Sequence, residues 1–331
     1  MRYLGPSISP EAALRDLGSD SLRVRVEAAE ALGRVDPGEA QRACAALRPL
    51  LDDDSPDVRY ATALSLGRLE DRGSVDRLMR MLAEDPESMP RQAAAVALGD
   101  IGAPQAAPAL ARALFDAPAD VRFQAASALP LVDPAAAVEP LRRALQDADA
   151  EVRATAAAAL GDLRDDGSRD TLARLVEDPD IRVRMEAAMA LARQGDRRGT
   201  PELTAALDHR DFGPLAAEHL FRCPDKLAAP SLHRALERWL TAPTVKVWAA
   251  GALARLGERG GREQLLHQLN SSKELVRGLT IQVLGEMGQP WSRKALRSLL
   301  ERPASADWER WRFEILQALE GRADEPSETA G

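Results

Sequence analysis

Apolar residues recur along this chain with the period of an amphipathic helix, and similar phrases return many times. In VRATAAAALGDL, Val152, Ala156, Leu160 and Leu163 fall at i, i+4, i+8 and i+11, which places them on one helix face. A second helix follows in several copies, marked by two leucines four residues apart: Leu110/Leu114, Leu141/Leu145, Leu203/Leu207 and Leu232/Leu236. One helix pair cannot bury both apolar stripes alone, so the pattern predicts helix pairs that stack on one another.

Each copy carries a basic residue at a fixed place. These residues are Arg25, Arg59, Arg91, Arg122, Arg153, Arg184, Lys246, Arg277 and Arg312, with Gly213 where the seventh copy falls. Their spacing averages about 32 residues, which is typical of solenoids built from helix pairs. Eleven residues further on, four copies have a glycine, where a helix end needs a positive φ: Gly102, Gly195, Gly257 and Gly288.

An aspartate precedes the basic residue by six positions in five successive copies. The pairs are Asp53/Arg59, Asp85/Arg91, Asp116/Arg122, Asp147/Arg153 and Asp178/Arg184. We expect each aspartate to cap the first helix of its repeat through backbone N–H groups. We expect each arginine, one turn into that helix, to reach a neighbouring aspartate and so form a structural ladder along the stack.

The phrase D-x-x-x-x-V-R-x-x-A-A-x-A-L-G resembles HEAT repeats, specifically the short repeats of the phycobilisome-lyase-like (E-Z) type. The resemblance implies an all-α fold, a right-handed α-solenoid of about ten HEAT-like helix pairs whose second helices line the concave side. The expected organisation is a single solenoid over 1–320, divided into an N-terminal capping helix (1–21), regular repeats (22–207) and divergent repeats with a C-terminal cap (208–320). The polar tail, 321–331, is expected to be disordered.

The composition changes where regularity ends, near residue 208. All histidines and tryptophans lie beyond it: His209, His219, His233, His267, Trp239, Trp248, Trp291, Trp308 and Trp311. Trp239 and Trp248 are either aromatic anchors for a partner or fillers of gaps in a degenerate repeat, and the sequence leaves both open. For Trp308 and Trp311, together with Phe313, a cap over the open end of the stack is the favoured interpretation.

A second candidate surface follows the second helices. Arginines stand two residues after the first leucine of the pair at Arg80, Arg112, Arg143, Arg174 and Arg234, with Ala205 and His267 at the same place. On a concave face, these side chains would form a track for an acidic helix or tail of another protein. The alternative is a solvated helix face in a chain where arginine is much the commoner basic residue.

Charge and composition narrow the possible partners. The formal net charge of −8 argues against a nucleic-acid binder, which needs a large basic footprint. No apolar segment is long enough to span a bilayer and no apolar leader opens the sequence, so a cytoplasmic protein that does not bind membranes is expected. The two cysteines, Cys44 and Cys223, fit a reducing compartment and predict buried thiols rather than a disulfide framework.

Catalytic constellations are weakly represented. Deoxyhypusine hydroxylase has similar repeats and holds two irons with repeated His-Glu pairs, but here the adjacent pair Glu218-His219 is reversed and single. A DNA-glycosylase-like cleft could be built from Trp239, Lys246 and Trp248, although the overall acidity disfavours it. We therefore predict no metal, no cofactor and no catalytic residue.

The function predicted from the sequence is a non-catalytic protein–protein interaction scaffold or adaptor. It would bind another protein along the concave face or at the divergent repeats of residues 208–320. The alternative implied by the resemblance is a phycobilin lyase-like or chromophore-handling chaperone subunit. The sequence leaves the oligomeric state open.

Overall fold

The computed structural model describes residues 8–301 and 306–320, with the backbone alone for residues 306–310. Within these ranges the chain forms twenty α-helices and no strand. An all-α solenoid is therefore the fold of the described chain, as the periodicity predicted.

The helices form nine consecutive pairs between two single helices, α1 (Pro10–Asp16) and α20 (Ala306–Glu320). The first helices of the pairs are α2 (Leu22–Leu32), α4 (Pro56–Arg68), α6 (Ser88–Ile101), α8 (Ala119–Val132), α10 (Ala150–Asp162), α12 (Ile181–Arg193), α14 (Gly213–Arg222), α16 (Pro243–Arg255) and α18 (Glu274–Met287). The second helices are α3 (Ala40–Leu47), α5 (Val75–Glu84), α7 (Ala107–Ala113), α9 (Pro134–Ala144), α11 (Arg169–Leu175), α13 (Thr200–Ala206), α15 (Ala229–Glu237), α17 (Arg259–Gln268) and α19 (Pro290–Leu300). Short 3-10 turns lead into five of the second helices.

The chain divides into two compact units, Met1–Thr171 (unit 1) and Leu172–Gly331 (unit 2). The division falls inside α11 and not near residue 208, where the composition changes. The boundary between the two units and the change in composition therefore fall at different places along the chain.

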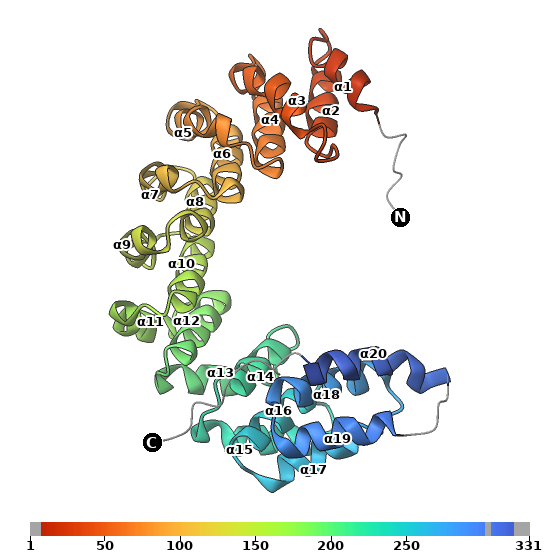
Figure 1. Ribbon diagram of the computed structural model, residues 1–331. Coiled ribbons are helices and arrows are strands. Elements are labelled where there is room, and N and C mark those ends of the chain that lie inside the picture. The colour runs from red at the N-terminus through yellow and green to blue at the C-terminus, as the bar shows by residue number, and fades with distance from the viewer. Residues whose placement is uncertain (1–7, 302–305, 321–331) are drawn as a thin grey trace. The chain divides into compact units, whose positions relative to one another are not determined.

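Unit 1 is a curved stack of two helix layers. The first helices α4, α6, α8 and α10 lie along the inside of the curve, and the second helices α5, α7 and α9 lie along its outside (Figure 1). The resemblance implied that the second helices line the concave side, and for unit 1 that expectation is wrong.

Small residues explain why the first helices occupy the inside. A Cβ on Gly67 of α4 would lie 2.8 Å from the Cα of Ala97 in α6, and one on Gly99 would lie 2.9 Å from the Cβ of Ala128 in α8. Helices that meet through glycine and alanine approach more closely than helices that meet through leucine. The closely spaced layer becomes the inner one.

The helix ends confirm the predicted glycine positions. Gly102, Gly195, Gly257 and Gly288 all have positive φ, between 60° and 85°. The same register is occupied by Glu70 (φ 50°) in one repeat and by Arg164 (φ 51°) in another. The repeat therefore imposes the left-handed conformation at this place even where the residue is not glycine.

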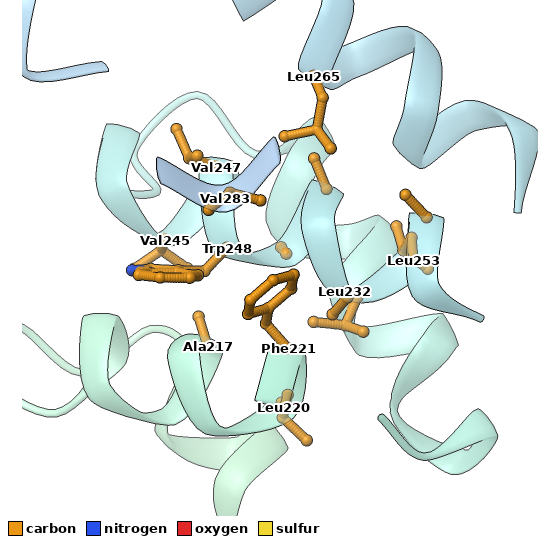
Figure 2. Close-up of a cluster of buried hydrophobic side chains, with 14 of the residues drawn as sticks. Ala217, Leu220, Phe221, Leu232, Val245, Val247, Trp248, Leu253, Leu265 and Val283 are labelled. Carbon is orange, nitrogen blue, oxygen red and sulfur yellow. The ribbon is translucent and has the colours of Figure 1, made fainter. Parts of the chain in front are cut away.

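In unit 2, bulky side chains take over part of the core. Phe221 is fully buried between α14 and α16, and its ring centroid lies 5.1 Å from that of Trp248 (Figure 2). Gly251 makes room for it, since a Cβ there would lie 2.8 Å from the Phe221 ring. Phe221 stands where earlier repeats have Gly67 and Gly99, and the space for its ring is provided by a glycine in the next repeat.

The last described helix covers the end of this core only in part. Trp311 of α20 is buried, and its ring lies against Gly278 of α18, where a Cβ would meet the ring at 2.9 Å. Phe313 is 69% exposed, so its expected role in the cap is wrong. The side chain of Trp308 and the tail at 321–331 lie outside the described residues.

Candidate functional site

The arginines of the repeated phrase make bidentate contacts with the aspartate of the following repeat. Arg59 donates from Nε and Nη2 to the two carboxylate oxygens of Asp85 at 2.7 and 2.9 Å. The same fork joins Arg25 to Asp53, Arg91 to Asp116 and Arg122 to Asp147. Both partners are largely buried, and such charge-assisted bonds are stronger than neutral ones.

The remaining guanidinium nitrogen, Nη1, donates to a backbone carbonyl oxygen of the arginine's own repeat. Nη1 of Arg59 donates to the carbonyl oxygen of Asp53 at 2.8 Å, and Arg91, Arg122, Arg153 and Arg184 make the equivalent bond to Asp85, Asp116, Asp147 and Asp178. Asp53, Asp85, Asp116 and Asp147 thus each accept one arginine on the side chain and another on the backbone. In unit 2 the pattern departs, because Nε of Arg184 donates to Glu202 at 2.8 Å.

The predicted capping role of these aspartates is wrong. The carboxylates of Asp53, Asp85, Asp147 and Asp178 accept the N–H of the residue two positions later, which precedes the helix; Asp53 accepts from Ser55 at 2.9 Å. After Asp116 that position is Pro118, which has no N–H. Where a side-chain cap exists, it comes from that later residue: Asp149 accepts from Glu151 and Val152 at the start of α10. The ladder aspartates therefore shape the loop and leave the helix start to their neighbours.

A second set of ion pairs, not foreseen from the sequence, joins the second helices to the next repeat. Arg48 donates to both carboxylate oxygens of Asp71 at 2.8 and 2.6 Å, and Arg142 does the same to Asp165. At the corresponding positions of a later repeat, Nε2 of His233 lies 2.5 Å from Oε2 of Glu258. A glycine two residues after the aspartate makes room for each guanidinium: Gly73 beside Arg48 and Gly167 beside Arg142.

The charges of these pairs stabilise each other. Burial by itself would raise the pKa of Asp71, but the hydrogen bonds and charge of Arg48 hold it below its usual range. The pKa of Asp165 is lowered chiefly by its hydrogen bond from Arg142. For Asp147 in the ladder, burial again acts to raise the pKa, but the hydrogen bonds from Arg122 and from the Asp149 N–H, together with the charge of Arg122, lower it overall.

The arginine stripe of the second helices is solvent-exposed. Arg80, Arg112, Arg143, Arg174 and Arg234 all have exposed side chains. In unit 1 they belong to the outer helix layer, so they do not form a track along the inside of the curve (Figure 1). Arg143 also lies 3.5 Å from Glu139 of its own helix.

The two tryptophans singled out from the sequence lie at different places. Trp239 is 85% exposed in the loop between α15 and α16 and lines a recess with Lys246. Trp248 is only 4% exposed, packs in the core and shows one side to a different, larger groove. The structure therefore does not bring Trp239, Lys246 and Trp248 into one cleft.

That larger groove is a broad recess in the surface of unit 2. It has a volume of about 1040 Å³ and is lined by the first helices α14, α16 and α18 and by the single last helix, α20. Its apolar residues include Trp248, Leu275, Leu279 and Trp311, and its acidic residues are Glu218, Glu274, Glu286 and Glu314. This surface is called the unit 2 groove below.

The electrostatics of the unit 2 groove are acidic. Among the described residues that line it there is no lysine, arginine or histidine. Three arginines lie beside it: Arg222 is 2.8 Å from Glu218 and 3.9 Å from Glu286, Arg255 donates to the carbonyl oxygen of Glu286 at 3.0 Å, and the Arg277 guanidinium lies 5.7 Å from the centroid of the Trp311 ring. The groove therefore has carboxylates and an apolar floor in its lining and arginines at its border.

A smaller recess in unit 1 has the same chemistry. It holds about 590 Å³ and is lined by α2 and α4, with Glu27, Glu30 and Asp57 around Leu22 and Tyr60. It also includes Arg23, which pairs with Glu27 at 2.7 Å. Acidic groups around apolar side chains are thus a property of first helices in both units.

The histidines and cysteines have ordinary surroundings. Nε2 of His219 lies 3.0 Å from a guanidinium nitrogen of Arg193. Within the described chain, no three His, Cys, Asp or Glu side chains gather as they would around a metal ion, and no helix is long and apolar enough to cross a membrane. Cys44 is buried and its pKa is raised mainly by burial, whereas Cys223 is only half-buried, contrary to the expectation of two buried thiols.

Stacked helix pairs joined by repeated Arg–Asp forks define the class of the protein as an α-solenoid. The family model for HEAT repeats matches residues 44–130, 110–173, 138–220 and 229–320, so the chain belongs to the HEAT-repeat family. No curated protein matches the sequence.

Several solved structures are similar in fold. YibA of Escherichia coli shares 22% identity over 75% of this chain and 93% of its own, with a TM-score of 0.56. An engineered protein shares 22% identity over 94% of this chain and 98% of its own, with a TM-score of 0.51. The CpcE–CpcF complex of phycocyanin lyase from a Nostoc species shares 23% identity over 85% and 96% of the chains, with a TM-score of 0.41.

Proposed function

We propose that the protein is a non-catalytic scaffold that binds another protein, with the unit 2 groove as its main binding surface. The observation that carries this proposal is a groove of about 1040 Å³ with two tryptophans in its lining. Recessed aromatic side chains are the usual anchors of protein interfaces. A groove between packed helices is preformed, so little ordering is needed on binding.

The arginine stripe is the competing surface. It has exposed guanidinium groups suited to carboxylates, but Arg80, Arg112 and Arg143 line none of the three recesses described above, in which a partner could bury apolar side chains. Exposed charge pairs contribute only about 0.2–1 kcal/mol each. The groove is therefore the stronger candidate.

Site-specific photo-crosslinking in cells of the source organism separates the two surfaces. A photoreactive amino acid is placed at Leu275, which is 69% exposed in the groove, and in a second version at Arg112 on α7. The proposal predicts a discrete protein adduct from position 275 and none from position 112. An adduct from position 112 alone would assign binding to the stripe, and no adduct from either position would contradict the scaffold function.

A further inference from the structure

We infer that a recess beside α16 binds an aspartate or glutamate side chain that another protein presents next to an apolar residue. The recess has a volume of about 390 Å³ and is lined by residues of α16, α17 and α18 and of the loops before α16 and α18. It is called the ladder recess below, and its lining includes Trp239, Thr241, Lys246, Gln268, Ser271 and Lys273. It shares no lining residue with the unit 2 groove, so this inference does not rest on the proposed function.

The register of the repeats is the first ground. In the regular ladder, Asp147 follows its partner Arg122 by 25 residues. The same step from Lys246 leads to Ser271. Oγ of Ser271 accepts the N–H of Lys273 at 3.2 Å, which is the bond that most ladder aspartates make with the residue two positions later. Ser271 therefore has the place of a ladder aspartate but not its charge.

The charge of the lining is the second ground. Its basic side chains are Lys246, Lys273 and His267, and among the described residues it includes no aspartate or glutamate. Lys246 is half-buried, and its Nζ donates to the carbonyl oxygen of Leu236 at 3.0 Å. Within the described chain neither lysine forms an ion pair with a carboxylate. Charges removed from water are normally paired, so a carboxylate from a partner would complete the contact that the regular repeats make internally.

The charged residues around the recess do not cancel this preference. Within two positions of a lining residue stand three arginines and three glutamates, whose charges balance: Arg238, Arg262, Arg277, Glu237, Glu263 and Glu274. Five of the six have contacts of their own. Glu274 and Arg277 interact with other groups, and the remaining contacts are Arg238 with Asp208, Glu263 with Arg259 and Arg262 with the Trp291 ring. The two lysines therefore set the sign of the charge in the recess.

Trp239 and two buried polar atoms are the third ground. Trp239 is 85% exposed, and an apolar residue next to the incoming carboxylate would pack against its indole, a favoured anchor of interfaces. Oγ1 of Thr241 and Oε1 of Gln268 are buried and have no hydrogen-bond partner within the described chain. A hydroxyl can donate to a carboxylate, and an amide oxygen can accept a peptide N–H. A peptide segment carries both groups, whereas a free inorganic anion has no N–H to donate.

Three labelled peptides test the chemistry of the ligand against the full-length protein. They are twelve residues long and differ at one position before a leucine, which is aspartate, asparagine or phosphoserine, and binding is read by fluorescence anisotropy. The aspartate peptide is expected to bind at least about fivefold more tightly than the asparagine peptide, with an affinity that falls as salt is added. Equal binding of the asparagine peptide, or equal or tighter binding of the phosphoserine peptide, overturns the inference.

Ser271→Asp locates the binding by adding a group to the recess. The new carboxylate would stand at the ladder position near Lys246 and compete with the peptide, so the aspartate peptide should bind about tenfold more weakly or worse. The melting temperature should stay unchanged or rise, since the variant restores a ladder aspartate. Ser271→Asn, of the same size but neutral, should change binding less than about twofold. Undiminished peptide binding by Ser271→Asp, or a lower melting temperature, would show that the position does not have the proposed role.

The four lysines of the chain provide a pair of charge-matched variants. Lys246→Met/Lys273→Met removes both lysines of the recess, and Lys226→Met/Lys294→Met removes the two that are exposed elsewhere. The recess variant should weaken the aspartate peptide about tenfold or more, and the control variant should change its binding less than about twofold. Equal losses would mean that the peptide responds to the overall charge of the protein, which contradicts the assignment.

Discussion

Removal of one ladder arginine tests whether the repeated Asp–Arg phrase stabilises the stack. In Arg122→Ala, Asp147 loses two hydrogen bonds of 2.8 and 2.7 Å, and the carbonyl oxygens of Asp116 and Ala117 lose their donor. The two partner side chains are only 14% and 11% exposed, so water cannot fully replace the guanidinium. The variant leaves a mostly buried carboxylate without its charge partner.

The expected loss is about 3 kcal/mol, because removal of one partner of a buried ion pair costs about 3–5 kcal/mol and this pair keeps some access to solvent. For a unit of this size, each kcal/mol lowers the melting temperature by about 2–4 °C, which predicts a fall of about 6–12 °C. Urea unfolding followed by circular dichroism measures the loss in free energy of unfolding. The matched control is Arg112→Ala on the exposed stripe, whose stability is expected to lie within about 0.5 kcal/mol of that of the unmodified protein. If the two variants unfold alike, the ladder does not stabilise the fold.

The pH dependence gives an independent check. The pKa of Asp147 is lowered in the folded protein, so its contribution to stability is present above the unfolded pKa, near 3.9, and is lost as pH falls through the folded value. The difference between Arg122→Ala and the unmodified protein should therefore shrink below about pH 4. Asp147→Asn in the Arg122→Ala background should restore part of the stability at pH 7, because it removes the unpaired charge. A difference that does not depend on pH would mean that lost packing, and not charge, explains the effect.

Three further predictions concern backbone and thiols. Glu70→Gly should stabilise the protein by about 0.5–1 kcal/mol in urea unfolding, since φ is 50° there and a side chain is unfavourable in that conformation. Gly73→Ala should destabilise the protein by about 2 kcal/mol or more, because the new methyl group collides with the guanidinium of Arg48, which is paired with Asp71. Gly260 has the same place in a later repeat but open space around it, so Gly260→Ala should be nearly neutral in the same assay. Alkylation of the native protein, followed by mass spectrometry, should label Cys223 well before Cys44, whose thiol is buried with a raised pKa; equal rates would contradict that burial.

The regular features of the fold were predictable because each repeat solves the same packing problem. The helix pairs, the buried Leu110 and Leu141, and the positive φ of Gly102 follow from local periodicity and from one recurrent phrase. The side of the curve on which each layer lies was not predictable from hydrophobic pattern alone. It depends on how closely helices approach at glycine and alanine contacts such as Gly67 against Ala97, which join residues of different repeats.

The candidate site was also harder to predict, because its residues come from different repeats. The unit 2 groove is lined by residues of four helices that are far apart in the sequence, and its glutamates have no common spacing. Trp248 was singled out, but its companions were not recognised. The second set of ion pairs does have a sequence signature. An arginine directly follows the first leucine of the second helix, an aspartate comes 23 residues later, and a glycine follows two residues after that aspartate, as in Arg48, Asp71 and Gly73.

The close contacts between first helices in unit 1 make the direction of the array adjustable by single methyl groups. If a side chain at Gly67 or Gly99 pushed one inner contact apart by about 1 Å while the outer layer, about 10 Å away, stayed fixed, the two repeats would rotate by about 6°. Such rotations add along a chain of repeats, so a few substitutions would redirect distant repeats without altering any of their own residues. Relatives with the same surface chemistry could in this way present it to partners of different shape.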